Sequence, residues 1–201
     1  MGRVSLMITT MLVALVLGSG VALAATIVGT NGDDTRNGTA NRDVMYGLGG
    51  DDILRGRGGN DEIDGGANGD MYLSGGAGND EVSGGSGADG LFGGDGFDLL
   101  YGGNGADGIY GGDATGEGRN ELYGGPGNDI ITADSPPAPD EVYGGSGDDT
   151  IYADDDVLDY IDCGIYRSPG TTVLDNDTVY ADRIADGDLF DDILYDCETI
   201  N

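Results

Sequence analysis

Hydrophobic and polar positions recur every nine residues along most of the chain. From Gly75 the sequence reads GGAGNDEVS, GGSGADGLF, GGDGFDLLY and GGNGADGIY without interruption to Tyr110. In each unit a glycine-rich stretch precedes an acidic residue, and the second residue after that acid is apolar. An inward apolar residue between two outward ones is typical of a short strand, and glycine gives a turn the positive φ angles that it needs. Each unit therefore predicts one turn followed by one strand.

The acidic sixth position of the unit keeps its register far along the chain. It is occupied by Asp34, Asp43, Asp52, Asp61, Asp70, Asp80, Asp89, Asp98, Asp107, Asn120, Asp129, Asp140 and Asp149. After an exception at Arg36, the inward eighth position holds Met45, Leu54, Ile63, Tyr72, Val82, Leu91, Leu100, Ile109, Leu122, Ile131, Val142 and Ile151. Two units complete one coil, so stacked coils would pair their strands in parallel and bury this apolar column. The pattern predicts an all-β parallel solenoid.

Acidic residues dominate the composition and suggest a role for the turns. The chain has 38 Asp and Glu against 8 basic residues, a formal charge of −30. Turns one coil apart would lie about 4.8 Å from each other, so their carboxylates and carbonyl oxygens would converge in all-oxygen sites that suit Ca²⁺. We expect several calcium ions, bound by Asp52, Asp61, Asp70, Asp80, Asp89, Asp98, Asp107, Asp129 and Asp149.

The same composition excludes several classes of function. The chain contains no His, which excludes Ser-His-Asp and Cys-His nucleophilic sites and His-ligated zinc. Its charge has the wrong sign for binding nucleic acid through phosphate contacts. A carboxylate-pair glycosidase is compatible with the composition, but calcium already accounts for the acids. We therefore expect no catalytic activity.

The first residues are typical of an export signal. Arg3 precedes an apolar run from Met7 to Leu17, and an Ala-Leu-Ala sequence ends at Ala24. The run is short for a membrane span, so we expect a signal peptide over residues 1–24, cleaved after Ala24, and no stable membrane insertion afterwards. The protein would then be secreted or held at the cell surface, where Cys163 and Cys197 are expected to form a disulfide.

The nonapeptide G-G-x-G-x-D-x-U-x resembles the haemolysin-type calcium-binding repeat of the RTX (repeats-in-toxin) proteins. The resemblance spans about Gly29 to Tyr152 and implies a right-handed parallel β-roll, to which we assign residues 25–152, with calcium in its turns. Residues 153–201, with Ile161-Asp162-Cys163-Gly164 and Asp196-Cys197-Glu198, resemble the two-cysteine C-terminal stretch of small secreted bacterial members. We expect this stretch to be a cap that continues the roll. Many RTX proteins carry a hydrolase domain, but here the repeats begin almost at the expected cleavage point.

Alternate units would share one edge of the roll, and the two edges differ in sequence. The first edge would carry Asp52, Asp70, Asp89, Asp107, Asp129 and Asp149, and we expect five continuous inter-turn sites there. All insertions fall in the turns of the second edge, with one extra residue before Asp80, four before Asn120 and two before Asp140. There we expect good sites only between Asp61 and Asp80 and between Asp80 and Asp98. Because one apolar side chain per strand makes a thin core, calcium binding and folding should be one event.

Two further residue sets allow more than one interpretation. Tyr101, Tyr123 and Tyr143, with Phe92, Tyr110 and Tyr152 on the opposite sheet, would form aromatic rows. Such rows either stabilise neighbouring strands or grip an extracellular polysaccharide. Arg36, Arg42, Arg55 and Arg57 gather in the first coils, where capping and local charge relief are expected. The sequence thus favours a secreted calcium-binding roll, with a glycan-binding adhesin or matrix component as the alternative and an RTX-type hydrolase as a less favoured one.

Overall fold

The computed structural model describes residues 24–112, 119–133, 138–154, 157, 159–164, 176–181, 193–195, 197 and 199–200. All regular elements in these ranges are β-strands, and no helix there has the length and apolarity needed to cross a membrane. Residues 1–23 of the predicted signal peptide and residues 113–118 and 134–137 fall outside the described residues.

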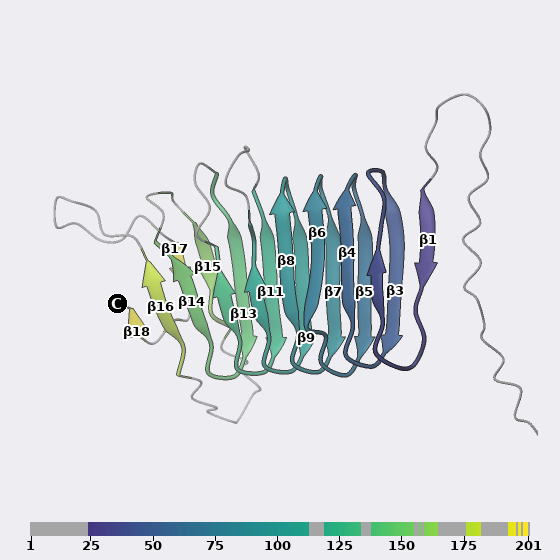
Figure 1. Cartoon of the computed structure of the whole chain (residues 1–201). Helices are drawn as coiled ribbons and strands as arrows, with labels where there is room; N and C mark the ends of the chain where they lie inside the picture. Colours follow the sequence, from purple (N-terminus) through teal and green to yellow (C-terminus); the bar gives the residue numbers. More distant parts are fainter. Residues whose placement is uncertain are drawn as a thin grey trace, which may run out of the picture.

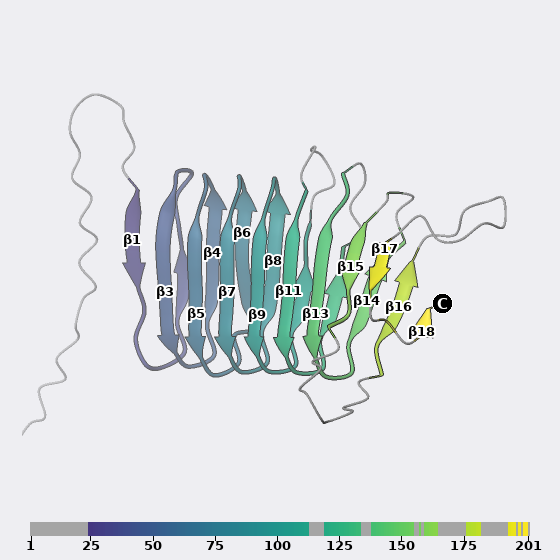
Figure 2. The same cartoon turned by 180° about the vertical axis from the view of Figure 1, so that it is seen from behind.

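Eighteen strands form two nine-stranded parallel sheets, and successive strands alternate between them (Figures 1 and 2). The odd sheet contains β1 Ala25–Val28, β3 Asp43–Gly49, β5 Glu62–Ala67, β7 Glu81–Ser86, β9 Leu99–Asn104, β11 Glu121–Pro126, β13 Glu141–Ser146, β15 Tyr160–Asp162 and β17 Ile193–Tyr195. The even sheet contains β2 Thr35–Asn37, β4 Ile53–Gly58, β6 Tyr72–Ala77, β8 Gly90–Asp95, β10 Gly108–Tyr110, β12 Ile130–Thr132, β14 Thr150–Ala153, β16 Thr178–Ala181 and β18 Thr199–Ile200.

Each strand pairs with the strand two elements later, one complete coil along the chain. Ile63 of β5 lies in register with Val82 of β7, and Leu91 of β8 with Ile109 of β10. This pairing follows from the nine-residue period, because equal units place equal positions above one another. The predicted all-β parallel solenoid is confirmed.

The core is a single column of side chains between the two sheets. Its fully buried members include Met45, Leu54, Ile63, Val82, Leu91, Leu100, Ile109, Leu122, Ile131, Val142 and Ile151. At the N-terminal end Ile27 packs against the column, and Arg36 stands at the inward position opposite Leu54. One buried side chain per strand is a thin core, as the sequence predicted.

The inward residue of β6 is Leu73, so the prediction that Tyr72 points inward is wrong. Leu54 pairs in register with Leu73, whereas Tyr72 pairs with Ile53 at an outward position. Leu73 is fully buried. The physical reason is that the smaller aliphatic side chain fits the narrow column, while the tyrosine ring finds aromatic neighbours on the outer face.

The extra residue in this coil also lies elsewhere than predicted. The sequence predicts the extra residue in the turn before Asp80. In the structure the extra residue is Met71, directly after Asp70, and its side chain is 69% exposed. The amide of Met71 still donates to the carbonyl of Asp52 in the previous coil, so the pairing resumes at once. The turn before Asp80 is therefore regular.

Strand pairing continues beyond Tyr152. Strands β15 and β17 extend the odd sheet, and β16 and β18 extend the even sheet. Ile161 and Val179 are fully buried and prolong the core column. Cys163, directly after β15, forms a disulfide with Cys197, two residues after the end of β17, so the expected pairing of the two cysteines is confirmed.

Candidate metal sites

Glycines shape the turns that lead to the acidic positions. In the turn Gly84–Gly87, the glycines at the second and fourth positions, Gly85 and Gly87, have φ angles of 102° and 139°. Side chains disfavour this left-handed region, so glycine is the natural residue there. Leu48, Arg57 and Asn68 take similar angles of 79°, 83° and 78° without being glycine, which makes the first turns the least regular.

Each sixth-position residue is tied to its counterpart in the next coil. The backbone N–H of one residue donates to the Oδ1 atom of the next, as Asp89 does to Asp107 over 2.8 Å. On the first edge this ladder runs through Asp34, Asp52, Asp70, Asp89, Asp107, Asp129, Asp149 and Asp177. On the second edge it runs through Asp43, Asp61, Asp80, Asp98, Asn120, Asp140 and Asp159. All nine predicted ligands therefore lie in two stacked rows.

The second carboxylate oxygen distinguishes the middle coils. In Asp52, Asp61, Asp70, Asp80, Asp89, Asp107 and Asp129 the Oδ2 atom is buried and has no hydrogen-bond partner in the protein. These residues are themselves at most 3% exposed. A buried carboxylate oxygen without a partner is costly, so each of these atoms needs a cation or a proton.

The first glycine of each turn leaves room for this oxygen. A Cβ atom added to Gly84 would lie 2.5 Å from Oδ2 of Asp89 and 2.5 Å from the carbonyl oxygen of Gly102 in the next coil. The same convergence of a carboxylate oxygen and a carbonyl oxygen recurs at Gly56 and Gly124. No point in the described ranges gathers three or more acidic or cysteine side chains. The oxygens come from both side chains and backbone, a donor set that suits Ca²⁺.

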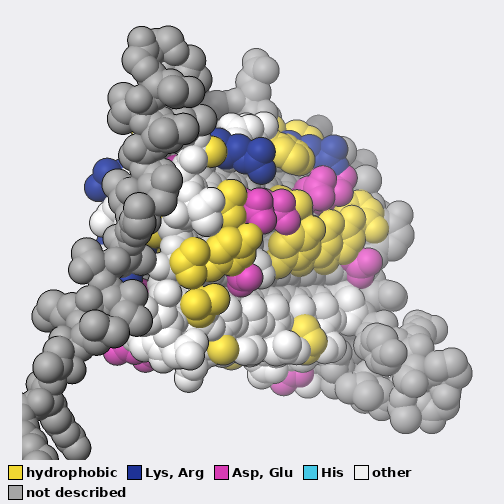
Figure 3. All heavy atoms as spheres, turned by 90° about the vertical axis from the view of Figure 1, so that its right-hand side faces the viewer, with side chains coloured by type: hydrophobic (Ala, Val, Ile, Leu, Met, Phe, Trp, Pro, Cys, Tyr) yellow, Lys and Arg dark blue, Asp and Glu magenta, His cyan; other side chains and the backbone are white. Residues whose placement is uncertain are grey.

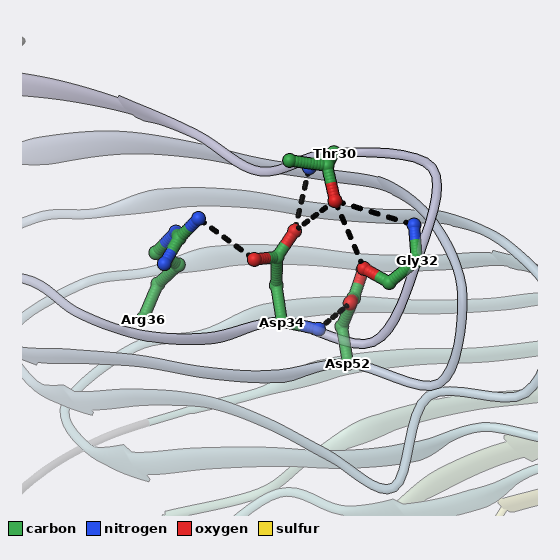
Figure 4. Close-up of polar contacts among 5 residues, drawn as sticks. All are labelled: Thr30, Gly32, Asp34, Arg36 and Asp52. Carbon is green, nitrogen blue, oxygen red and sulfur yellow. Dashed lines mark hydrogen bonds and ion pairs between the residues drawn. The ribbon is translucent and has the colours of Figure 1, made fainter. Parts of the chain in front are cut away.

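The first coil satisfies its acids without a metal (Figure 4). Oδ2 of Asp34 accepts hydrogen bonds from the backbone N–H and the hydroxyl of Thr30, and Oδ1 lies 2.7 Å from Arg36. Oδ2 of Asp43 accepts a hydrogen bond from the N–H of Thr39. Asp34 and Asp43 therefore differ from the later acids, and the contact of Arg36 fits the predicted capping role.

The second edge is more regular than expected. The backbone N–H of Asp98 donates to Oδ1 of Asn120 over 3.0 Å, and the backbone N–H of Asn120 donates to Oδ1 of Asp140 over 2.6 Å. The hydrogen-bond ladder therefore crosses both inserted turns. What changes at Asn120 is the second side-chain atom, because its buried Nδ2 replaces a carboxylate oxygen and has no partner. Metal binding at this edge stays a prediction.

Burial makes the ladder carboxylates reluctant to ionise without a metal. Desolvation raises the pKa of Asp70 to about 7, although the hydrogen bond from Asp52 opposes this shift. The same cause raises the pKa of Asp80, Asp89 and Asp129 to about 6. It also raises the pKa of Asp52, Asp61 and Asp107. A nearby divalent cation would lower these pKa values again.

The nine-residue pattern did not predict two residues of the hydrogen-bond ladders. Asp159 and Asp177 are at most 1% exposed, and each accepts a backbone hydrogen bond from the previous coil. Neither residue follows a G-G-x-G turn, so the nine-residue pattern ends before them. The remaining signal was the apolar residue two positions later, Ile161 and Val179 respectively.

Aromatic side chains stack in rows on both outer faces. Ring centroids lie 5.0 Å apart for Tyr101–Tyr123, 4.7 Å for Tyr123–Tyr143, 4.6 Å for Tyr72–Phe92, 5.2 Å for Phe92–Tyr110 and 4.8 Å for Tyr152–Tyr180. Figure 3 shows one face on which apolar side chains form such bands, with acidic and basic side chains beside them. Each ring covers the face of its neighbour, and this supports a strand-stabilising role.

Two nine-stranded parallel sheets joined by stacked Gly–Asp turns define a β-solenoid of nonapeptide repeats. The family model of the RTX calcium-binding nonapeptide repeat (4 copies) matches residues 37–72, 72–91, 91–115, 114–135 and 138–158. The chain therefore belongs to this family, whose repeats bind calcium, and the resemblance found in the sequence is confirmed. No curated protein matches the chain.

Proposed function

We propose that the protein is an exported calcium-binding β-solenoid that folds when calcium binds. The observation that carries this proposal is the set of buried Oδ2 atoms without a hydrogen-bond partner in Asp52, Asp61, Asp70, Asp80, Asp89, Asp107 and Asp129. Asp52, Asp61, Asp70, Asp80, Asp89, Asp107 and Asp129 would hold the ions together with first-glycine carbonyl oxygens, and Asp98 and Asp149 occupy the same ladder positions. Bound calcium would supply the positive charge that lets adjacent coils stack.

The coupling of calcium to folding rests on the balance between core and charge. The core offers one buried side chain per strand, while the whole chain carries a formal charge of −30. Self-repulsion of this size destabilises a compact state. Ions that bind only the stacked turns stabilise the folded state by mass action. Calcium sites in extracellular modules bind at about 10⁻⁴ to 10⁻³ M, and we propose this range for the protein outside the cell.

Circular dichroism during a calcium titration tests the proposal. The purified protein in chelator should give a largely disordered spectrum, and calcium should convert it cooperatively to a β-rich one. Asp107→Asn keeps the hydrogen bond to Asp89 but removes one negative charge. It should therefore shift the calcium midpoint upwards by severalfold.

Asp64→Asn is the matched control, because Asp64 is exposed on the outer face of β5 and lies outside both ladders. Its calcium midpoint should equal that of the unmodified protein. A full β spectrum with a cooperative melt in chelator would overturn coupled folding, and isothermal titration without binding heat would overturn calcium binding itself.

We propose no catalytic role for the carboxylate rows, because their side chains are buried and bonded to the neighbouring coil. A substrate would have to separate two coils to reach them. The glycan-binding alternative gains no support from the aromatic rows, because sugar rings stack on open aromatic faces and these faces are covered by other rings.

A further inference from the structure

The outer faces of the two sheets differ in charge. The odd sheet presents six acidic side chains at its outward strand positions: Glu62, Asp64, Glu81, Glu121, Glu141 and Asp162. The corresponding positions of the even sheet, called here the even face, are Thr35, Asn37, Ile53, Arg55, Tyr72, Ser74, Gly90, Phe92, Gly108, Tyr110, Ile130, Thr132, Thr150, Tyr152, Thr178, Tyr180 and Thr199. None of these described positions is acidic, in a chain with 38 acids, and the one acid within the described even-sheet strands is Asp95, exposed at the end of β8.

The even face also exposes much apolar surface. Tyr110, Ile130, Tyr152 and Tyr180 are 44%, 50%, 39% and 39% exposed, and they lie on the four neighbouring strands β10, β12, β14 and β16. Large apolar side chains that adjoin one another on a surface commonly mark an interaction site. We propose that the protein forms a two-fold symmetric dimer in which the even faces of two copies meet.

Charge favours a second copy on this face. Two strongly acidic molecules repel wherever carboxylates meet, and the outward positions that define the even face carry no carboxylate, with Asp95 at the end of β8 as the one acid in its strands. A two-fold axis through β10, the middle strand of nine, makes the two solenoids antiparallel. Arg55 on β4 of one copy then faces β16 of the other. Arg55 and Arg57 lie on β4 of the even sheet, so the basic end of this sheet lies over strands β14, β16 and β18 of the partner, which contain no basic residue.

The size of the even face suits a dimer of modest affinity. Nine strands spaced at about 4.8 Å give a strip roughly 40 Å long, and four residues at about 3.3 Å give a width of roughly 13 Å. Each copy would bury about 500 Å², or about 1,000 Å² in total, which is the lower limit for a specific interface. An isologous contact of this kind closes after two copies, so we expect dimers and no fibres.

The dimer goes beyond the proposed calcium function, and sedimentation velocity in saturating calcium tests it separately. The protein should sediment as a concentration-dependent mixture of monomer and dimer. Tyr152→Glu, which places a charge twice in the interface, should weaken dimerisation by about tenfold or more. The matched control is Tyr101→Glu on the odd face, because Tyr101 is 37% exposed and stacks on one neighbour as Tyr152 does. Its dimerisation should be unchanged.

Circular dichroism on the same samples distinguishes a variant that does not fold from one that folds but does not dimerise. Both variants should reach the β-rich state in calcium, and Ile130→Glu provides a second test on the even face if Tyr152→Glu does not fold. A β-rich unmodified protein that stays monomeric at high concentration would overturn the dimer without affecting calcium binding. Equal loss of dimer in Tyr101→Glu and Tyr152→Glu would also overturn it. A monomer that binds an insoluble neutral β-glucan, and loses that binding in Tyr152→Glu, would assign the face to a polysaccharide instead.

Discussion

At the scale of single residues, the first glycine of each turn is needed for its lack of a side chain. Gly84 has ordinary backbone angles, yet an added Cβ would crowd the carboxylate of Asp89 and the carbonyl oxygen of Gly102. Both oxygens belong to the candidate calcium site. The glycine thus matters for metal binding through the space that it leaves, whereas the glycines at the second and fourth positions of the turn matter for their φ angles.

Gly84→Ala should therefore weaken calcium binding, because the new methyl group displaces two oxygen donors. We expect the calcium midpoint in circular dichroism to rise severalfold. Gly108→Ala is the control, since the nearest atom to its added Cβ would be the carbonyl oxygen of Asp89 at 3.9 Å. Equal midpoints for Gly84→Ala and Gly108→Ala would contradict the proposed site geometry.

The raised carboxylate pKa values give the ladder a defined pH dependence. In the metal-free solenoid the pKa of Asp70 is about 7 and that of Asp80 is about 6, against an ordinary value of 3.8. The folded state thus binds protons more tightly than the unfolded chain. Its stability without metal should be highest below about pH 4 and should fall as pH rises through about 6 to 7. Calcium competes with these protons, so its affinity should fall on acidification.

Calcium titrations and thermal melts at two pH values check the expected effects on calcium affinity and on metal-free stability. Calcium binding measured at about pH 8 and about pH 5.5 should be weaker at the lower pH, and thermal melts in chelator should show more residual structure there. A calcium midpoint that does not change between the two pH values would mean that the ladder carboxylates are already ionised in the metal-free protein.

At the scale of elements, the disulfide takes the place of a glycine turn. Cys163 lies one coil beyond Gly144, and Gly164, with a φ angle of 78°, stacks on Gly145. A buried sulfur thus occupies a position that glycine keeps open in the repeats. The last coils are joined by a covalent bond, whereas the proposed calcium ions would stabilise the middle coils.

Removing this bond should destabilise the protein even when calcium is saturating. Cys163 and Cys197 are 34 residues apart, for which the chain-entropy model gives about 3–4 kcal/mol. Cys163→Ser combined with Cys197→Ser should lower the melting temperature, and reductant should do the same to the unmodified protein. An unchanged melt in both cases would show that the C-terminal strands do not limit stability.

How far the strands could be predicted depended on the regularity of the turns. The inward residues from Val82 to Ile109 followed directly from the nine-residue spacing, because each turn there has the same length. Tyr72 was misassigned because counting forward from Asp70 ignores the extra residue. Counting back from Gly75, the start of the next turn, gives Leu73 instead.

The candidate site was predictable in its rows but not in its ends. Spacing alone placed Asp52 to Asp129 on two edges, since stacking follows from the period. It could not show that Thr30 and Arg36 satisfy Asp34, because that contact depends on how the first turn folds back. Asp159 lacked a preceding glycine turn, and only the stacking of β15 on β13 placed it in the ladder.

At the scale of the whole molecule, every coil contacts mainly the coils before and after it. Stability in such a protein is close to a sum of coil and interface contributions. Deleting residues 75–92, one complete coil, joins Ser74 to Gly93 and leaves both ladders in register. The shortened protein should still fold in calcium, bind fewer ions and melt at a somewhat lower temperature.

Calorimetry and circular dichroism would measure these three properties together. The control is deletion of residues 75–88, which removes the end of β6 and all of β7 but leaves the second half of the coil, and so breaks the register. That variant should not reach the β-rich state at any calcium concentration. Failure of the deletion of residues 75–92 to fold would show that contacts beyond adjacent coils hold the solenoid together.

The equivalence of the coils has a consequence for how the gene can change. Segments that encode neighbouring coils are similar in sequence and invite unequal recombination. An exchange that adds or removes a whole coil yields another protein with the same turns, the same core column and the same two ends. The number of coils in this molecule can therefore change from one variant to the next, whereas the nine-residue unit fixes the cross-section of each coil.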